Sequence, residues 1–401
     1  MALKVLTPAG RKVFLLLFFQ KKKFFLFTVP DIRLQRLTLT DFRSYKAVRF
    51  SPAAWLCVLT GANGSGKTNL LEAVSLLVPG RGLRGAKFSE LARQGQEASG
   101  SWAVAATVQT VDGACEIGTG TGEDQERRVF RLDGAAPRSQ AEVGVRLAAV
   151  WLTPQMDRLF TEAAAGRRKF LDRLVVALEP GHAREVAAFE AASAQRNRLL
   201  AEGNADPDWL AGLEDSIARH AVAATATRLA LVGRLNTVLA AGVAAPFPAV
   251  GLTLDCEIAA RLAAAPALAV EGFLRESLAG ARAADAARGA ASLGPQRADV
   301  LIADAATGRA ASQSSTGQQK SMLIGIILGH AALIAAARGA APILLLDEPL
   351  VHLDEAHRLA LFAALIRQGL HALLTGTDAA PFRPLEAAYY EVSEGRIDLA
   401  L

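Results

Sequence analysis

The sequence contains few cysteines, and the three that are present, Cys57, Cys115 and Cys256, stand far apart. No pair of them has the spacing of metal ligands. Isolated thiols of this kind predict buried apolar side chains in a reducing compartment. Neither a zinc site nor a disulfide framework is indicated.

An apolar run long enough to cross a membrane is also lacking. The most apolar N-terminal stretch, 13–27, is divided by Lys21, Lys22 and Lys23 into two short runs. A spanning helix needs about 20 apolar residues, and each of these runs is much shorter. No uninterrupted apolar core precedes a set of small residues, so a secretory signal is not indicated. We interpret residues 1–30 as an extension outside the fold, and we expect a soluble, cytoplasmic protein with no other segment able to span a bilayer.

Neither an excess of charge nor a fixed-period repeat marks the chain as disordered or repetitive. Apolar residues make up 51% and charged residues 21%, which is typical of a globular protein. At 401 residues the chain is long for one compact core, so we expect two domains. The net charge of +5 mildly favours a polyanionic partner.

Strand patterns occur at both ends of the chain, with a helical region between them. The strand patterns are IRLQRLTL from Ile32, AWLCVLT, a pair of strands around Asp112-Gly113, RRVFRLDG, VGLTLDCEI, DVLIAD, PILLLDE and HALLTGT. Residues 162–242 favour about three helices, and residues 258–291 favour one more. This order predicts an α/β head interrupted by a helical insertion. We assign residues 31–155 and 291–401 to the head and 156–290 to the insertion.

The strongest local motif is GANGSGKT, which follows an apolar strand pattern and precedes a helical one. Its residues are Gly61, Ala62, Asn63, Gly64, Ser65, Gly66, Lys67 and Thr68. Glycines let backbone N–H groups surround a phosphate chain, and the helix N-terminus adds favourable partial charge. The motif predicts a phosphate-binding loop in which Lys67 reaches the β- and γ-phosphates of ATP and the Thr68 hydroxyl binds Mg²⁺.

A second motif, ILLLDEP, brings two carboxylates to the end of an apolar strand. Ligands bind at this end of the strands in parallel α/β sheets. Asp347 is placed to hold Mg²⁺, and Glu348 to polarise an attacking water. Asp354 follows in LVHLD, where its carboxylate is compatible with a helix cap or with a subunit interface.

The polar run QSSTGQQKSM precedes a third helical pattern. It is compatible with a helix cap, because Ser315 stands where a hydroxyl can accept a backbone N–H bond. It is also compatible with half of a nucleotide site, because a hydroxyl and a glycine N–H at a helix N-terminus bind anions well.

Further motifs make the chain resemble the RecF family, bacterial recombination-repair ATPases of the ABC/SMC/Rad50 class. These motifs are LTDFRSY, VWLTPQMDRLF, GRRKFLDRL, QRNRLL, GPQRADV, SSTGQQK and TGTD, in the family's order from about Ile32 to the C-terminus. The resemblance implies an ABC/Rad50-type ATPase head with an inserted, mainly helical arm. The insertion is too short for the long coiled coil of SMC and Rad50 relatives.

The resemblance also implies that ATP is held between two protomers. Ser315 and Gly317 of one head would contact the γ-phosphate of the nucleotide on its partner, and Asp354 would lie near that site. Where wider relatives have a histidine, this sequence offers Thr375 and Thr377, which implies a weaker contact and slow hydrolysis. The family position of Arg43 suggests that it faces the nucleotide, whereas Arg297 is matched by motif without a role.

The function that the resemblance implies is an ATP-dependent DNA-binding protein of recombinational repair and replication. It would act at gaps or junctions as an ATP-dependent homodimer, with DNA, RecR and RecO as partners, and help to load recombinase. Arg81, Arg84 and Lys87, and Arg167, Arg168 and Lys169, are either DNA contacts or a solvated surface. Two alternatives stay open at this point: the soluble ATPase subunit of an ABC transporter, and a non-catalytic ATP-dependent scaffold.

Overall fold

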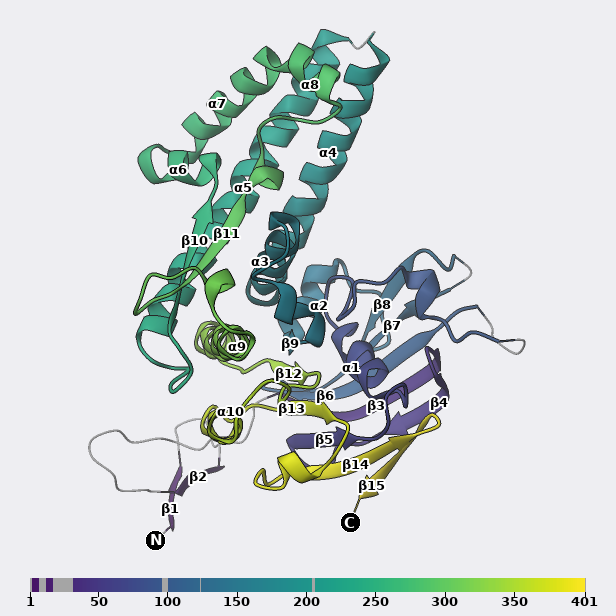
Figure 1. Ribbon diagram of the computed structural model, residues 1–401. Helices are drawn as coiled ribbons and strands as arrows, with labels where there is room; N and C mark the ends of the chain where they lie inside the picture. The colour runs from purple at the N-terminus through teal and green to yellow at the C-terminus, as the bar shows by residue number, and fades with distance from the viewer. Residues whose placement is uncertain are drawn as a thin grey trace. The chain divides into compact units, whose positions relative to one another are not determined.

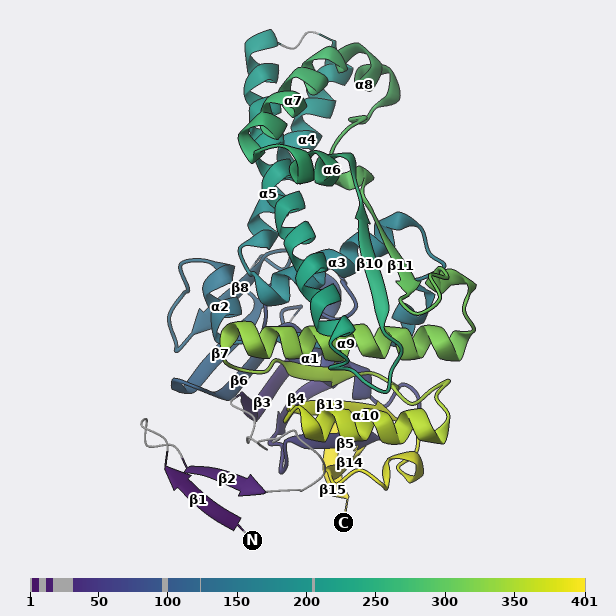
Figure 2. The same cartoon turned by 90° about the vertical axis from the view of Figure 1, so that its left-hand side faces the viewer.

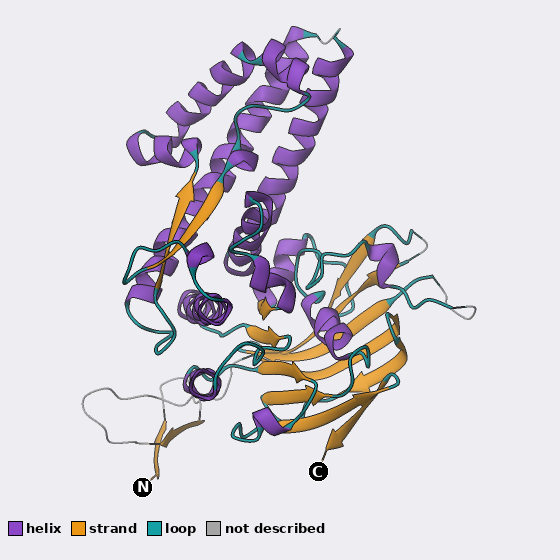
Figure 3. Cartoon of the chain, viewed as in Figure 1, coloured by secondary structure: helices purple, strands orange, loops and turns teal. Residues whose placement is uncertain are grey.

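The computed structural model describes residues 2–6, 12–16, 32–95, 100–122, 124–203 and 206–400. The chain forms two compact units, each of which is described by itself. The head unit comprises Met1–Asp157, Gly242–Pro248 and Thr316–Leu401, and the arm unit comprises Arg158–Ala241 and Ala249–Ser315. Figure 1 labels the elements of both units. Figure 3 shows that strands predominate in the head unit and helices in the arm unit.

The first sheet of the head unit is mainly parallel. It consists of β5 (Leu56–Thr60), β9 (Ala149–Leu152), β12 (Ile343–Leu346), β13 (Ala372–Gly376), β14 (Ala388–Ser393) and β15 (Arg396–Ala400). The strand order is β15-β14-β5-β13-β12-β9, and only the β14–β15 pair is antiparallel. The central strands β12 and β13 are buried along their whole length, as expected for strands covered on both faces. This order brings the C-terminal ends of β5, β13 and β12 to one edge.

The second sheet of the head unit is antiparallel. Its strands are β3 (Arg33–Phe42), β4 (Tyr45–Phe50), β6 (Ala103–Thr110), β7 (Gly113–Thr121) and β8 (Arg128–Leu132). They are ordered β4-β3-β6-β7-β8. β6 and β7 pair around the predicted Asp112-Gly113 turn, where Gly113 has a φ of +120°. Buried and exposed side chains alternate along β6, which is typical of a strand with one covered face.

Among the described residues of the head unit, four α-helices accompany the two sheets. They are α1 (Lys67–Ser75), α2 (Gln140–Arg146), α9 (Thr316–Arg338) and α10 (Glu355–Arg367). α1 packs against β9, β12 and β13 of the first sheet and also against β3 of the second. α9 and α10, seen side-on in Figure 2, pack against each other.

Helix α9 corrects one expectation from the sequence. Among the described residues it is the one helix whose length and apolar composition would suffice to cross a membrane. The polar start of the helix and its small residues hide this property from a search for a continuous apolar run. However, 78% of its apolar window is buried inside the protein, as in the core helix of a globular fold.

The arm unit is mainly helical. Its elements are α3 (Ala164–Leu178), α4 (His182–Glu202), α5 (Pro207–Ala240), β10 (Val250–Asp255), α6 (Glu257–Ala264), α7 (Ala267–Gly280), α8 (Arg282–Arg288) and β11 (Asp299–Asp304). Side chains such as Phe189, Ile217, Ile258 and Leu274 form its apolar core. The single helix expected over 258–291 is three helices. Pro266 ends α6 because a proline disfavours helical geometry in the residue before it.

The arm unit also reaches further along the chain than the residues assigned to the insertion from sequence. β11 pairs with β10 along its whole length, from Val250–Asp304 to Asp255–Asp299. This antiparallel ladder draws residues up to Ser315 into the arm, whereas Gly242–Pro248 belongs to the head. Strand pairing over this distance leaves no local signal in the sequence.

Hydrogen bonds between two motifs join distant segments of the arm. Arg167 binds both carboxylate oxygens of Asp299 at 2.7 Å, and Arg168 donates to the carbonyl of Ala298 at 2.7 Å. These bonds join GRRKFLD to GPQRADV. Arg297, for which the sequence offered no role, donates to the carbonyl of Ala291 at 3.2 Å. Arg167 and Arg168 therefore have partners inside the arm.

A partly buried ion pair reinforces the same region. Asp172 accepts two hydrogen bonds from Arg228, at 2.7 and 2.8 Å, and lies 2.8 Å from Nε2 of His182. Arg228 also donates to the carbonyl of Pro295 at 2.9 Å. Burial alone would raise the pKa of Asp172, but the bonds from His182 and Arg228 bring it below its usual value. Asp172 is therefore a structural anion.

Near the N-terminus, β1 (Ala2–Leu6) and β2 (Lys12–Leu16) form an antiparallel two-stranded sheet of their own. The remainder of the extension predicted for residues 1–30 lies outside the described residues.

Candidate nucleotide site

The glycine-rich loop connects β5 to α1, as its sequence predicts. Gly61 has a φ of +145°, and a Cβ atom there would lie 2.3 Å from the carbonyl oxygen of Val392. Gly66 has a φ of +113°, and its Cβ would lie 2.7 Å from the hydroxyl of Tyr45. Any larger residue at either position would have to displace its neighbour. The Tyr45 hydroxyl donates to the carbonyl of Gly66 at 3.0 Å and holds the loop where the helix begins.

Lys67 lies folded over this loop. Its ammonium donates to the carbonyls of Gly61 at 2.7 Å and Ala62 at 2.8 Å, and the residue is only 5% exposed. Burial lowers the pKa of Lys67, while the negative charges of Glu348 and Asp347 act in the opposite direction. Ser65 adds a buried hydroxyl without a hydrogen-bond partner among the described residues. An unsatisfied donor and a cation on one loop form a suitable site for an anion.

Asp347 stands where β12 ends, opposite the loop. It accepts hydrogen bonds from the Thr68 hydroxyl, at 2.9 Å to Oδ1 and 3.1 Å to Oδ2. The two residues are 279 positions apart. A hydroxyl and a carboxylate are hard oxygen donors of the kind Mg²⁺ prefers, and Mg²⁺ usually binds one or two carboxylates together with phosphate oxygens. Among the described residues no cluster of three acidic, histidine or cysteine side chains offers a complete metal cage.

Glu348 follows Asp347 with its backbone in the left-handed region, at a φ of +47°. For a residue with a Cβ this conformation costs about 1–2 kcal/mol. Its N–H donates to the hydroxyl of Thr375 at 2.9 Å, and that hydroxyl lies 2.8 Å from Oδ1 of Asp347. The sequence suggested a phosphate contact for Thr375. Its hydroxyl is instead buried and bonded to the two acidic residues.

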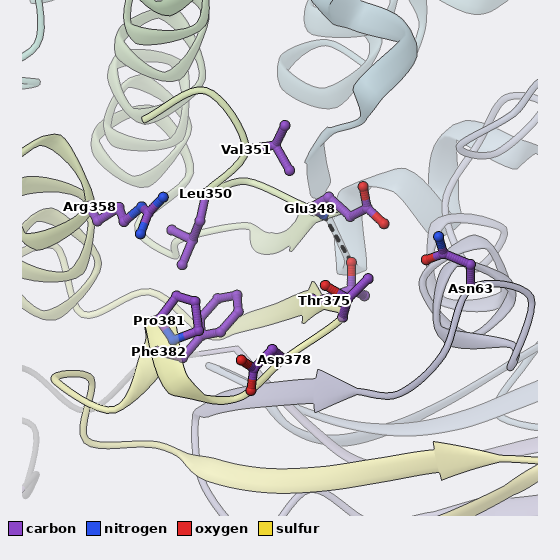
Figure 4. Close-up of a pocket in the computed structure, with 11 residues that line it drawn as sticks. Asn63, Glu348, Leu350, Val351, Arg358, Thr375, Asp378, Pro381 and Phe382 are labelled. Carbon is purple, nitrogen blue, oxygen red and sulfur yellow. Dashed lines mark hydrogen bonds between the residues drawn. The ribbon is translucent and has the colours of Figure 1, made fainter. Parts of the chain in front are cut away.

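A cavity of about 260 Å³ opens beside Glu348. Figure 4 shows the Glu348 side chain pointing toward Asn63 of the loop, with Asp378 and Arg358 on other parts of the wall. Thr377 also lines this cavity and is exposed. The cavity therefore gives solvent and small solutes access to the carboxylate of Glu348.

The polar run SSTGQQK lies at the start of α9. Ser315 directly precedes the helix and is exposed, and a Cβ on Gly317 would lie 3.2 Å from the carbonyl oxygen of His352. Lys320 is 1% exposed, and its ammonium lies 2.8 Å from Oδ1 of Asp157. This ion pair joins the run to the motif VWLTPQMDRLF. The exposed start of a long helix is compatible with both a cap and an anion site.

Asp354 is the N-cap of α10. Its carboxylate accepts the backbone N–H of His357 at 2.8 Å, and its side chain is 66% exposed. Of the two interpretations from sequence, the helix cap is therefore present, and the exposed side chain leaves an interface role as a prediction.

Arg43, expected to face the nucleotide, binds α1 instead. Its guanidinium makes two hydrogen bonds of 2.9 Å to the carboxylate of Glu72, which is fully buried. Arg84 donates to the same carboxylate at 3.0 Å. Sequence reasoning missed Glu72, although an acidic residue on an apolar helix face was a signal for a buried partner. Arg81 and Lys87 are exposed.

The parallel sheet, the phosphate loop and the carboxylate pair at one sheet edge define an ABC-type ATPase head, here with an inserted helical arm. The family model described as RecF/RecN/SMC N terminal domain matches residues 33–373. The DNA replication and repair protein RecF of Mesorhizobium japonicum is 43% identical over 91% of this chain and 97% of its own length. That of Agrobacterium fabrum is 45% identical over 91% of this chain and 98% of its own. The chain belongs to the RecF family.

Solved structures agree on the fold. A structure of the recombination mediator protein RecF with ATP covers 92% of this chain and 100% of its own, with a TM-score of 0.78 at 21% identity. An Smc head bound to the C-terminal winged-helix domain of ScpA covers 92% of this chain and 96% of its own, with a TM-score of 0.51 at 16% identity. Both comparisons confirm the predicted fold class.

Proposed function

We propose that this protein is an ATP-dependent DNA-binding protein of recombinational repair and replication, and that it hydrolyses ATP slowly. The observation that carries the proposal is the convergence of Lys67, Thr68 and Asp347 on one sheet edge. The Thr68 hydroxyl lies 2.9 Å from Asp347 although 279 positions separate them. Membership of the RecF family adds the biological setting.

In this proposal the loop N–H groups and Lys67 bind the phosphates of ATP. Thr68 and Asp347 hold Mg²⁺, which when bound neutralises charge on the phosphates. Glu348 accepts a proton from the attacking water, which its access to the cavity supports. We infer slow turnover because a side-chain contact to the γ-phosphate is missing here. No histidine follows β13, and the hydroxyl of Thr375 is bonded to the acidic pair instead.

Two heads are proposed to close on ATP, each presenting Ser315 and Gly317 to the nucleotide of its partner. The exposed start of α9 supports this role, because a long helix favours negative charge at its N-terminus. The dimer would bind DNA at gaps or junctions, act in the cytoplasm with RecR and RecO, and help to load recombinase. Binding through phosphates would carry little base specificity.

The transporter alternative is not favoured, because the relatives reported above are RecF proteins and the helical arm interrupts the head. A non-catalytic scaffold is not favoured either, because a carboxylate stands beside the accessible cavity at Glu348.

The test uses the full chain with ATP, with and without gapped duplex DNA. Turnover is measured by phosphate release, and mass by analytical ultracentrifugation. We expect an ATP-dependent dimer and DNA binding that weakens as salt rises. Glu348→Gln should bind ATP while turnover falls about a hundredfold, so that the dimer on DNA persists.

Three outcomes would count against parts of this proposal. Failure of the wild-type chain to bind ATP would show that the assignment of the nucleotide site is wrong. Normal turnover in Glu348→Gln would assign the base to another group. A dimer with ATP but without DNA affinity at low salt would favour the transporter alternative.

A further inference from the structure

Thr375 occupies a position between the two acidic residues that the catalytic roles above do not explain. It stands near the end of β13, which pairs with β12 up to Leu374 and Leu346. Its side chain is fully buried. The hydroxyl oxygen lies 2.9 Å from the N–H of Glu348 and 2.8 Å from Oδ1 of Asp347.

The direction of each hydrogen bond follows from the groups involved. A carboxylate only accepts, so the hydroxyl proton of Thr375 is donated to Asp347. A backbone N–H only donates, so a lone pair of the same hydroxyl faces Glu348. The Thr375 hydroxyl thereby makes a donor and an acceptor bond at once. Its proton is committed to Asp347 and is not directed at a phosphate.

The backbone here continues the hydrogen-bond pattern of β12 just past the end of the strand. The N–H of Asp347 donates to the carbonyl of Leu152 on β9, at 2.9 Å. The next N–H, that of Glu348, donates in the opposite direction within the sheet, to Thr375 on β13. N–H groups alternate in this way along β12 as well, but at Glu348 the acceptor is a side-chain hydroxyl and φ is positive. The bond to Thr375 therefore holds a backbone conformation that a glutamate does not adopt readily.

The Glu348 side chain has little else to hold it. Among the described residues its carboxylate accepts no hydrogen bond, and it lies at the wall of the open cavity (Figure 4). The backbone of Glu348 consequently sets the direction of the Cα–Cβ bond, from which the carboxylate reaches the cavity. Loss of the bond to Thr375 would let φ relax and would move the carboxylate away from Asn63 and the phosphate loop.

We propose that Thr375 is a positioning residue for hydrolysis, which fixes the Glu348 carboxylate through the backbone N–H of Glu348. The inference rests on the proposed ATPase function, and it assigns Thr375 a role different from a direct contact with the γ-phosphate. Thr68 still binds Asp347 when the Thr375 hydroxyl is removed. Loss of that hydroxyl should therefore lower the rate of hydrolysis while ATP binding stays nearly unchanged.

The test compares Thr375→Val with Thr375→Ser in the full chain. Valine has nearly the shape of threonine but no hydroxyl, whereas serine keeps the hydroxyl. We expect Thr375→Val to bind ATP within roughly threefold of the wild-type Kd. Its kcat should fall about tenfold to a hundredfold with KM nearly unchanged, because a small misplacement of a catalytic group has effects of this size. Thr375→Ser should restore most of the rate.

A double variant separates positioning from general damage. If Thr375 acts through Glu348, then Thr375→Val added to Glu348→Gln should lower the single-turnover rate no further. The control is Thr225→Val in the arm, where the threonine is equally buried and its hydroxyl has no hydrogen-bond partner among the described residues. This control should keep the wild-type rate.

Each result bears on one claim. Wild-type turnover in Thr375→Val overturns the positioning role and leaves the ATPase intact. Additive losses in the double variant also overturn it, as does a fall in ATP affinity and melting temperature that serine does not rescue. A wild-type chain that binds no ATP contradicts the proposed function itself.

Discussion

At the scale of single residues, Lys67 is a buried cation whose ammonium is held by carbonyls of its own loop. When ATP binds, the ammonium can exchange its hydrogen bonds to these carbonyls for bonds to negatively charged phosphate oxygens. Because the ammonium then faces a full negative charge in place of a carbonyl dipole, the lysine should contribute most once ATP is bound.

Lys67→Met tests this role. We expect ATP affinity to fall about a hundredfold, or about 3 kcal/mol, because the phosphate charge loses its partner. The melting temperature without nucleotide should stay the same or rise, since the substitution removes a buried charge. Titration calorimetry and thermal unfolding measure the two quantities. A large fall in melting temperature with unchanged affinity would make Lys67 a structural residue.

At the scale of elements, the arm is held by a charged cluster inside its apolar core. Arg196 of the motif QRNRLL is fully buried and donates to Glu214 at 3.0 Å, Asp285 at 2.9 Å and the carbonyl of Leu278 at 2.7 Å. These bonds join α4 to α5, α7 and α8. Glu214 also binds Arg282 at 2.6 Å.

Arg196→Met should destabilise the arm by about 3 kcal/mol, because it leaves buried carboxylates without their central cation. Arg198→Met is the matched control: it changes an exposed arginine of the same motif, and its effect should stay within about 0.5 kcal/mol. Urea unfolding followed by circular dichroism at 222 nm reports on the helices. Equal stability of the two variants would show that the cluster contributes nothing to folding.

At the scale of the whole molecule, the open question is whether Ser315 acts within its own chain or on a partner. A cap stabilises its own helix by about 1 kcal/mol, and its loss should leave ATP chemistry largely intact. A residue of a shared site would instead contact the nucleotide of a second chain. The two cases give different results when two defective chains are mixed.

Ser315→Arg should bind ATP normally as a monomer but fail to dimerise, because neither site then keeps the hydroxyl that would contact the nucleotide of the partner. A mixture with Lys67→Met should form an ATP-dependent heterodimer, since one composite site keeps an intact loop and an intact Ser315. Ultracentrifugation with differently labelled chains detects this heterodimer. If Ser315→Arg dimerises alone with ATP while the mixture gains nothing, Ser315 is only a cap.

The sequence by itself determined the features that depend on neighbouring residues. The phosphate loop needed Gly61 and Gly66 between a strand and a helix, and the acidic pair needed an apolar strand before it. Both motifs lie as the local pattern predicted, because turn geometry and side-chain periodicity act over a few residues. The break at Pro266 was equally local and could have been predicted.

Only the tertiary structure decided which distant residues meet. The partners of Arg43 and Arg196, and the hydroxyl of Thr375 between Asp347 and Glu348, depend on strands and helices far apart in the chain. The extent of the arm depends likewise on the pairing of β10 with β11. A buried charge must find a partner, but the sequence does not specify which of many candidates is near. That choice follows from packing, which brings one of them within hydrogen-bond distance.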